Sequence, residues 1–103
     1  MIAVKQTQFD SINNRKTDAS IIKSLGHPIR LKILTILDMR ECNVKHIWKY
    51  LGIEQAVVSQ HLAVLKKLGI VIGIRRGPEI FYSIINPLAQ RIIAVLNNEW
   101  KSL

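Results

Sequence analysis

The sequence is poor in the features that secreted and membrane proteins depend on. Its single cysteine, Cys42, excludes a disulfide within the chain. No apolar run approaches the roughly 20 residues that a membrane-spanning helix needs. Residues 1–10 lack the basic and then apolar order of a signal peptide. We therefore expect a cytoplasmic protein with no membrane partner.

Recognisable catalytic sets are also missing from the sequence. There is no glycine-rich phosphate loop, no pair of carboxylates in an apolar setting, and no Ser/His/Asp or Cys/His pairing with plausible geometry. We expect no enzyme activity, no small-molecule substrate and no cofactor. Aromatic residues make up only 6% of the chain, which disfavours RNA binding because stacking on exposed aromatic rings is its usual basis.

Acidic residues are scarce as well, with 7 Asp and Glu against 15 Lys and Arg and a formal net charge of +8. A compact chain this basic indicates a polyanionic partner, either nucleic acid or an acidic membrane surface. The length of 103 residues predicts one domain, and the hydrophobic content of 49% argues against disorder.

The most informative stretch is 51–69. At Leu51-Gly52-Ile53 an apolar run breaks at a glycine, which can end one helix and begin a tight turn. The following helix, Gln55 to Leu68, turns Val58, Leu62 and Leu65 inward. Its opposite face is small and polar at first and then basic, as a helix in the DNA major groove requires: Ala56, Ser59, Gln60, Ala63 and Lys67. The pattern predicts a helix-turn-helix whose second helix is the recognition helix.

The rest of the chain predicts a mainly α fold with a two-stranded β wing. Residues 1–16 form an N-terminal arm and 17–103 form one domain. Periodicity and capping residues predict the following elements: helices over 17–25, 28–39 and 44–51, the recognition helix, strands over 70–75 and 79–85 joined by a tip at 75–78, and a helix over 88–100.

Within these elements we expect Ile21, Ile22 and Leu25 to face one side of the first helix. The second helix buries Ile29, Ile33, Ile36 and Leu37 and leaves Arg30 and Lys32 outside. Residues 41–43 form a turn, with Asn43 the cap of the next helix.

Further cations surround the recognition helix. Lys45 and Lys49 lie one turn apart on the outer side of the preceding helix, and Lys66 and Lys67 close the recognition helix. The wing tip carries two arginines placed to contact a phosphate or a minor groove. We favour this interpretation over a merely solvated hairpin.

The final helix has an apolar stripe of Leu88, Ile92, Val95 and Leu96, widened by Ala89 and Ile93. A chain this small cannot easily cover such a surface, so we predict a homodimer. A two-fold dimer places two recognition helices about 34 Å apart and predicts a near-palindromic DNA site.

Four segments together resemble the ArsR/SmtB family of bacterial repressors: 25–34 (LGHPIRLKIL), 51–62 (LGIEQAVVSQHL), 68–71 (LGIV) and 81–84 (FYSI). The resemblance spans about residues 19–96. It implies a winged-helix homodimer, paired through its first and last helices, that binds operator DNA until a signal relieves repression. The implied base contacts are Gln55, Ala56, Ser59 and Gln60, and the implied backbone contacts are Arg75 and Arg76. The implied dimerisation residues are Ile21, Ile22, Leu88, Ala89, Ile92, Ile93 and Leu96.

This chain departs from the family pattern at the metal sites. Where many members have E-L-C-V-C-D-L, Asn43 and Lys45 replace the two cysteines, and the last predicted helix has neither Asp nor His. We therefore predict no metal. For the histidines we expect structural roles: His27 in a turn or cap, His46 in the first turn of a helix, and His61 as a hydrogen-bonded, half-buried ring.

Two alternatives stay open. Cys42 lies near a helix N-terminus, whose dipole favours a thiolate, so it is a candidate redox or persulfide sensor; packing under the turn is the favoured interpretation. A winged helix can also serve as a protein-interaction module. Such a module need not keep its cations on one side.

Glu54 stands at a position where the family often has Ser. Its carboxylate repels phosphate, so we predict no phosphate contact at this residue.

Overall fold

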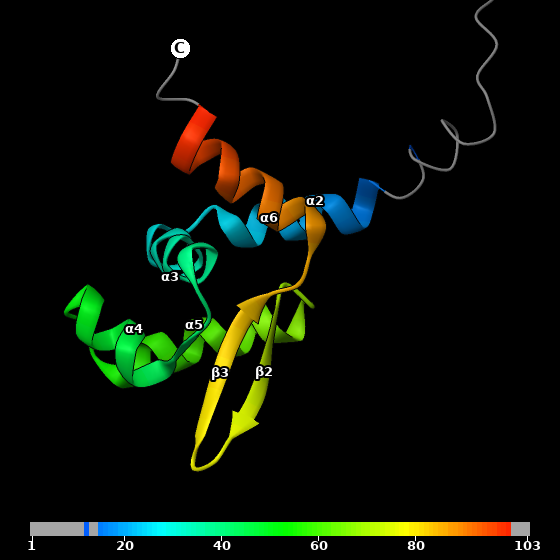
Figure 1. Cartoon of the computed structure of the whole chain (residues 1–103). Coiled ribbons are helices and arrows are strands. Elements are labelled where there is room, and N and C mark those ends of the chain that lie inside the picture. The colour runs from blue at the N-terminus through cyan, green and yellow to red at the C-terminus, as the bar shows by residue number, and fades with distance from the viewer. Residues whose placement is uncertain (1–11, 13–14, 100–103) are drawn as a thin grey trace, which may run out of the picture.

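The computed structural model describes residue 12 and residues 15–99 (Figure 1). Helices α2 and α6 form one end of the molecule, α4 and α5 form the other, and α3 lies between them; the β2–β3 hairpin projects beside α5. The elements are α2 (Arg15–Leu25), α3 (Pro28–Met39), β1 (Cys42–Asn43), α4 (Val44–Leu51), α5 (Gln55–Lys67), β2 (Val71–Arg76), β3 (Glu79–Ile84), α6 (Pro87–Ala94) and a π-helical turn, η1 (Val95–Glu99). The predicted helix-turn-helix with a wing is confirmed.

The helix starts follow from capping residues. The His27 ring accepts a hydrogen bond from the Ile29 N–H at 3.1 Å, and Pro28 occupies the first turn of α3, where no N–H is needed. The Asn43 side chain accepts from the His46 N–H at 2.9 Å and so caps α4. The predicted roles of both caps are confirmed.

Most of the core prediction holds, with two corrections. Ile33 and Leu37 are buried as predicted, but Leu34 is fully buried while Ile29 and Ile36 are only partly covered. On α2, Ile22 is 54% exposed because the buried residues Ile21, Ser24 and Leu25 define the inward face and the next position turns away. The helix also begins at Arg15, within the predicted arm, whose residues 1–11 and 13–14 lie outside the described residues.

The segment predicted as a turn at 41–43 contains a strand. Cys42 and Asn43 pair with Tyr82 and Phe81, so the sheet has three strands in the order β1-β3-β2. The hairpin turn lies at Gly77-Pro78, where Gly77 has φ 65°. Arg75 and Arg76 therefore belong to strand β2 rather than to the tip.

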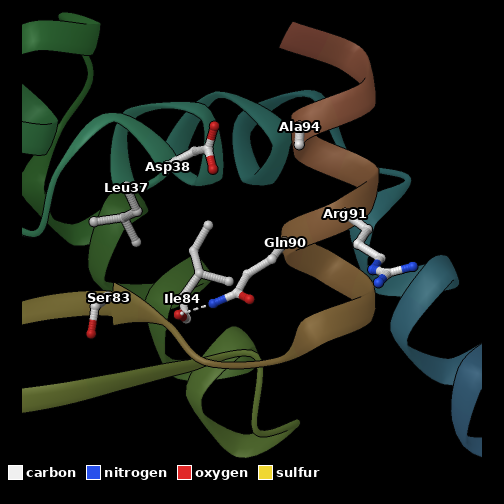
Figure 2. Close-up of a pocket in the computed structure, with 7 residues that line it drawn as sticks. All are labelled: Leu37, Asp38, Ser83, Ile84, Gln90, Arg91 and Ala94. Carbon is white, nitrogen blue, oxygen red and sulfur yellow. Dashed lines mark hydrogen bonds between the residues drawn. The ribbon is translucent and has the colours of Figure 1, made fainter. Parts of the chain in front are cut away.

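The last helix is α-helical only to Ala94 and continues as η1. Gln90 fixes it to the sheet by donating a hydrogen bond to the Ile84 carbonyl at 2.8 Å, beside a cleft of about 420 Å³ between α3, β3 and α6 (Figure 2). Among the described residues, none of the helices is both long and apolar enough to cross a membrane.

Candidate nucleic-acid interface

The outer face of α5 is open to solvent. Val58, Leu62 and Leu65 are buried in the core, as predicted, and anchor the helix along its inner side. The predicted DNA-facing residues are all exposed: Gln55, Ala56, Ser59, Gln60, Ala63, Lys66 and Lys67. Helix α5 is therefore held by its buried inner side and presents a row of short polar side chains to solvent on its outer side.

The turn before α5 sets the angle between the two helices of the motif. Gly52 adopts φ 68° and ends α4 by donating its N–H to the Trp48 carbonyl at 2.9 Å. Glu54 occupies the cap position of α5, and its side chain makes no capping hydrogen bond. Its carboxylate acts on the helix only through the dipole, which favours a negative charge there.

Exposed cations lie on α4, which precedes α5, and in the last turn of α5 itself. Lys45 and Lys49 lie on α4, and the Lys49 ammonium is 6.0 Å from the centre of the Trp48 ring. Lys66 and Lys67 stand in the last turn of α5, where they also stabilise the negative end of the helix dipole. The predicted cationic side chains are thus accessible around the recognition helix.

The two wing arginines differ in their surroundings. Arg76 forms an ion pair with Glu41, and its guanidinium lies 5.3 Å from the centre of the Phe81 ring. Arg75 has no ion-pair partner among the side chains that the structure describes in residues 15–98. Sequence reasoning missed this difference because Glu41 and Arg76 are 35 positions apart and no local pattern joins them.

A polar cluster joins α5 to the start of α3. Arg30 donates from Nε to Nδ1 of His61 at 3.1 Å and lies 3.4 Å from the Ser24 carbonyl and hydroxyl oxygens. The His27 and His61 ring centres are 4.4 Å apart. Arg30 is therefore half-buried, which corrects its predicted place outside; the half-buried, hydrogen-bonded ring predicted for His61 is confirmed.

Burial lowers the pKa of His61, and electrostatic interactions with the neighbouring His27 and Arg30 add to the effect. The neutral imidazole accepts at Nδ1 from Arg30, so its proton is on Nε2. The cluster holds the middle of α5 against α3.

The predicted dimerisation residues fall into two groups. Ile21, Ala89 and Ile93 are buried in the protomer's own core and are corrected to core positions. Helix periodicity cannot separate the two apolar sides of a helix that lies between a core and a partner. The other predicted residues keep apolar surface in the single chain, either exposed or partly buried: Ile22, Leu88, Ile92 and Leu96.

Cys42 is 3% exposed, and its thiol donates to the Arg40 carbonyl at 3.6 Å. It lines a groove of about 390 Å³ together with Met39, His46 and Tyr50. Within the part of the chain that the structure describes, no three His, Cys, Asp or Glu side chains gather in a way that could hold a metal ion.

Comparison with known sequences identifies similar proteins. The family model described as "Bacterial regulatory protein, arsR family" matches residues 27–72. The transcriptional repressor PagR of Bacillus anthracis is 41% identical over 81 residues, covering 78% of this chain and 81% of PagR. The biofilm growth-associated repressor of Agrobacterium fabrum is 36% identical over 94 residues, covering 90% of this chain and 80% of that protein.

Solved structures agree with these matches. The crystal structure of PagR superposes with a TM-score of 0.77 at 38% identity and covers 84% of this chain and 99% of that one. The homodimeric winged helix-turn-helix domain of Mb0332 from Mycobacterium bovis shares the fold, with a TM-score of 0.74 at 24% identity over 99% of this chain and 92% of that one.

Proposed function

The chain belongs to the ArsR family of bacterial regulatory proteins and is a DNA-binding transcriptional regulator. We propose that it represses transcription as a homodimer bound to a near-palindromic operator. The family and its relatives are regulators rather than enzymes. Repression is the role that the names of two relatives, PagR and the biofilm growth-associated repressor, state for those proteins.

The observation that supports this proposal most directly is the exposed outer face of α5. Amide and hydroxyl groups hydrogen-bond base edges, and alanines let the helix approach the groove floor closely. We assign base contacts to Gln55, Ala56, Ser59 and Gln60. Backbone phosphates are assigned to the surrounding cations: Lys45, Lys49, Lys66, Lys67, Arg75 and Arg76.

The homodimer is supported by apolar surface that the single chain leaves uncovered. Ile22 on α2 and Leu96 on η1 are exposed, and Leu88 and Ile92 are only partly buried. Covering such surface is favourable by about 25 cal/mol per Å². Mb0332, which has the same fold, is described as homodimeric. A two-fold pair through these helices would set two α5 helices about one DNA turn apart.

We further propose that relief of repression does not depend on a metal at the start of α4. Asn43 stands at one of the family's cysteine positions, and both ends of its amide are already hydrogen-bonded, to the His46 N–H and to Glu79. Zinc, nickel or cadmium should leave the operator affinity unchanged. A tenfold loss of affinity on adding any of them would contradict this.

Redox control through Cys42 is the less favoured alternative because the thiol is buried and its residue is paired within the sheet as part of β1. A Cys42→Ser variant tests it in a reporter strain. If the wild type responds to an oxidant and the variant does not, the thiol is the sensor. A response that persists in the variant excludes the thiol.

The main experiment measures binding to the protein's own upstream DNA and to a random duplex by fluorescence anisotropy at several salt concentrations. We expect tighter binding to the upstream DNA and a log–log salt slope set by the number of phosphates neutralised. Footprinting should show two related half-sites. Equal affinity for both duplexes, or a protein that stays monomeric in light scattering, would overturn the proposal.

A further inference from the structure

A two-residue strand connects the wing directly to the helix-turn-helix. β1 pairs with β3 through Cys42–Tyr82 and Asn43–Phe81. It immediately precedes α4, the first helix of the motif. The strand that pairs with the wing is therefore joined to α4 without any intervening residue.

The Asn43 side chain strengthens this connection. It is 5% exposed and bonded at both ends: its oxygen accepts from the His46 N–H at 2.9 Å, and its nitrogen donates to the Glu79 carboxylate at 2.9 Å. Because both the oxygen and the nitrogen of the amide are hydrogen-bonded, the side chain ties the first turn of α4 to the start of β3.

The second contact on this face is the ion pair between Glu41, just before β1, and Arg76 at the end of β2. Alternation along the strands places Arg76 on the same face as Phe81, and the guanidinium lies over that ring at 5.3 Å. The arginine is thus held by a carboxylate and an aromatic ring of its own chain.

Arg75 points to the opposite face of β2. That face includes Val71, which is buried in the core, and β2 packs against α5. Arg75 therefore projects on the side of the recognition helix, without an ion-pair partner among the side chains of residues 15–98. Among these described side chains, Arg76 is paired and its neighbour Arg75 is not.

The paired arginine can still exchange partners. The side chains of Arg76 and Glu41 are 52% and 38% exposed, and exposed ion pairs contribute little stability. A DNA phosphate accepts the same N–H donors as a carboxylate does. Glu41 and an approaching phosphate would therefore compete for one guanidinium.

We propose that Glu41 limits the affinity of this protein for DNA: its carboxylate competes with a backbone phosphate for Arg76, so that Arg75 makes the stronger wing contact with the duplex. Removing the charge of Glu41 frees Arg76 for the full phosphate contact. The inference rests on the proposed DNA-binding function and names the residue that sets the strength of the wing contact.

A double-mutant cycle tests the competition. Glu41→Gln, Arg76→Ala and the double variant are titrated with the upstream duplex and with a random duplex over a range of salt. We expect Glu41→Gln to tighten binding about two- to fivefold, the size of one partly exposed ion pair, and to steepen the salt slope by about 1. In the Arg76→Ala background the same change should have no such effect.

Asp18→Asn is the matched control. It removes one negative charge and frees Arg15 from an exposed ion pair on α2, at the end of the molecule away from α5. The gain from Glu41→Gln must exceed the gain from this variant, because a general increase in positive charge also favours DNA. Thermal melting verifies that all variants are folded.

Two results would overturn the proposal: no gain of Glu41→Gln over Asp18→Asn, or an equal gain with and without Arg76. Failure of the proposed function would show differently, as wild-type protein that binds its upstream DNA no better than a random duplex. The cycle is still informative in that case, because phosphate contacts do not depend on sequence and are measured on the random duplex.

Discussion

At one end of the molecule α2 and η1 expose Ile22, Val95 and Leu96, which are 54%, 43% and 42% accessible. At the other end α5 and β2 expose Gln60, Lys67 and Arg75. The elements of both ends (Figure 1) are amphipathic and their inner sides share one core. The two ends differ in the side chains that they leave exposed. The apolar end suits a second copy of the chain, and the polar, cationic end suits a polyanion.

In the proposed dimer, each recognition helix would make only a few hydrogen bonds to its own half-site. Joining two half-sites would raise the affinity for DNA through effective concentration. Substitutions at each end should therefore act on different quantities: oligomeric state at the apolar end, and base or phosphate contacts at the polar end.

Leu96→Glu should have the largest effect. A carboxylate placed in the apolar surface opposes pairing, so light scattering should report a monomer. Binding to the operator should weaken by about 100-fold or more, the usual gain from linking two sites. Met39→Glu, which introduces the same charge at an exposed methionine on α3, is the control. A dimeric Leu96→Glu protein would show that the apolar end is not the interface.

Gln60→Ala acts at the polar end. Loss of a base contact should cost about 1–3 kcal/mol on the operator and relax specificity at one base pair. The variant should stay dimeric, because Gln60 is exposed on α5. Titrations of the operator and a random duplex check this. Equal losses on both duplexes would make Gln60 a backbone contact instead.

Arg75→Ala and Arg76→Ala should differ in their effects on DNA binding, although both residues lie at the polar end. Arg75→Ala should reduce the salt slope by about 1, whereas Arg76→Ala should change it less, because Arg76 is already paired with Glu41. Salt titrations of both variants on one duplex decide the order. Equal slopes would mean that the two arginines contact DNA alike.

His61 lies between the two ends and should give the smallest effect. Burial lowers its pKa in the folded state, so the unfolded chain binds more protons and acid favours unfolding. The contribution of neutral His61 to the free energy of unfolding is complete above pH 6.5, the ordinary pKa of histidine. It declines as the pH falls through the lower pKa of His61 in the folded state. The melting temperature of the wild type should thus fall more steeply below pH 6.5 than that of His61→Gln, with His46→Gln as an exposed-site control. Parallel curves for wild type and His61→Gln would contradict this role.

Local signals explain what could be predicted from the sequence. Apolar spacing placed Val58, Leu62 and Leu65 inside α5 and its polar row outside, and capping chemistry placed His27 and Asn43 at helix starts. These properties depend on residues within a few positions of each other. The exposure of the assigned DNA-contact residues followed from the same periodicity.

Contacts between distant residues could not be predicted in this way. Strand β1 has two residues, too few for alternation to be visible, and its partners are Tyr82 and Phe81. Arg30 looked like an exposed cation but is held by Ser24 and His61. The apolar stripe of the last helix did not reveal which residues, such as Ala89 and Ile93, the protomer would bury for itself.

The sequence by itself determined the helices, the glycine turn at Gly52 and the polar face of α5, because hydrophobic periodicity and backbone preferences act over one or two turns of chain. Tertiary structure alone decided that Glu41 meets Arg76, that Asn43 bridges α4 and the wing, and which apolar side chains stay exposed. Those outcomes depend on how the elements pack, and packing brings together side chains whose separation along the chain contains no local signal.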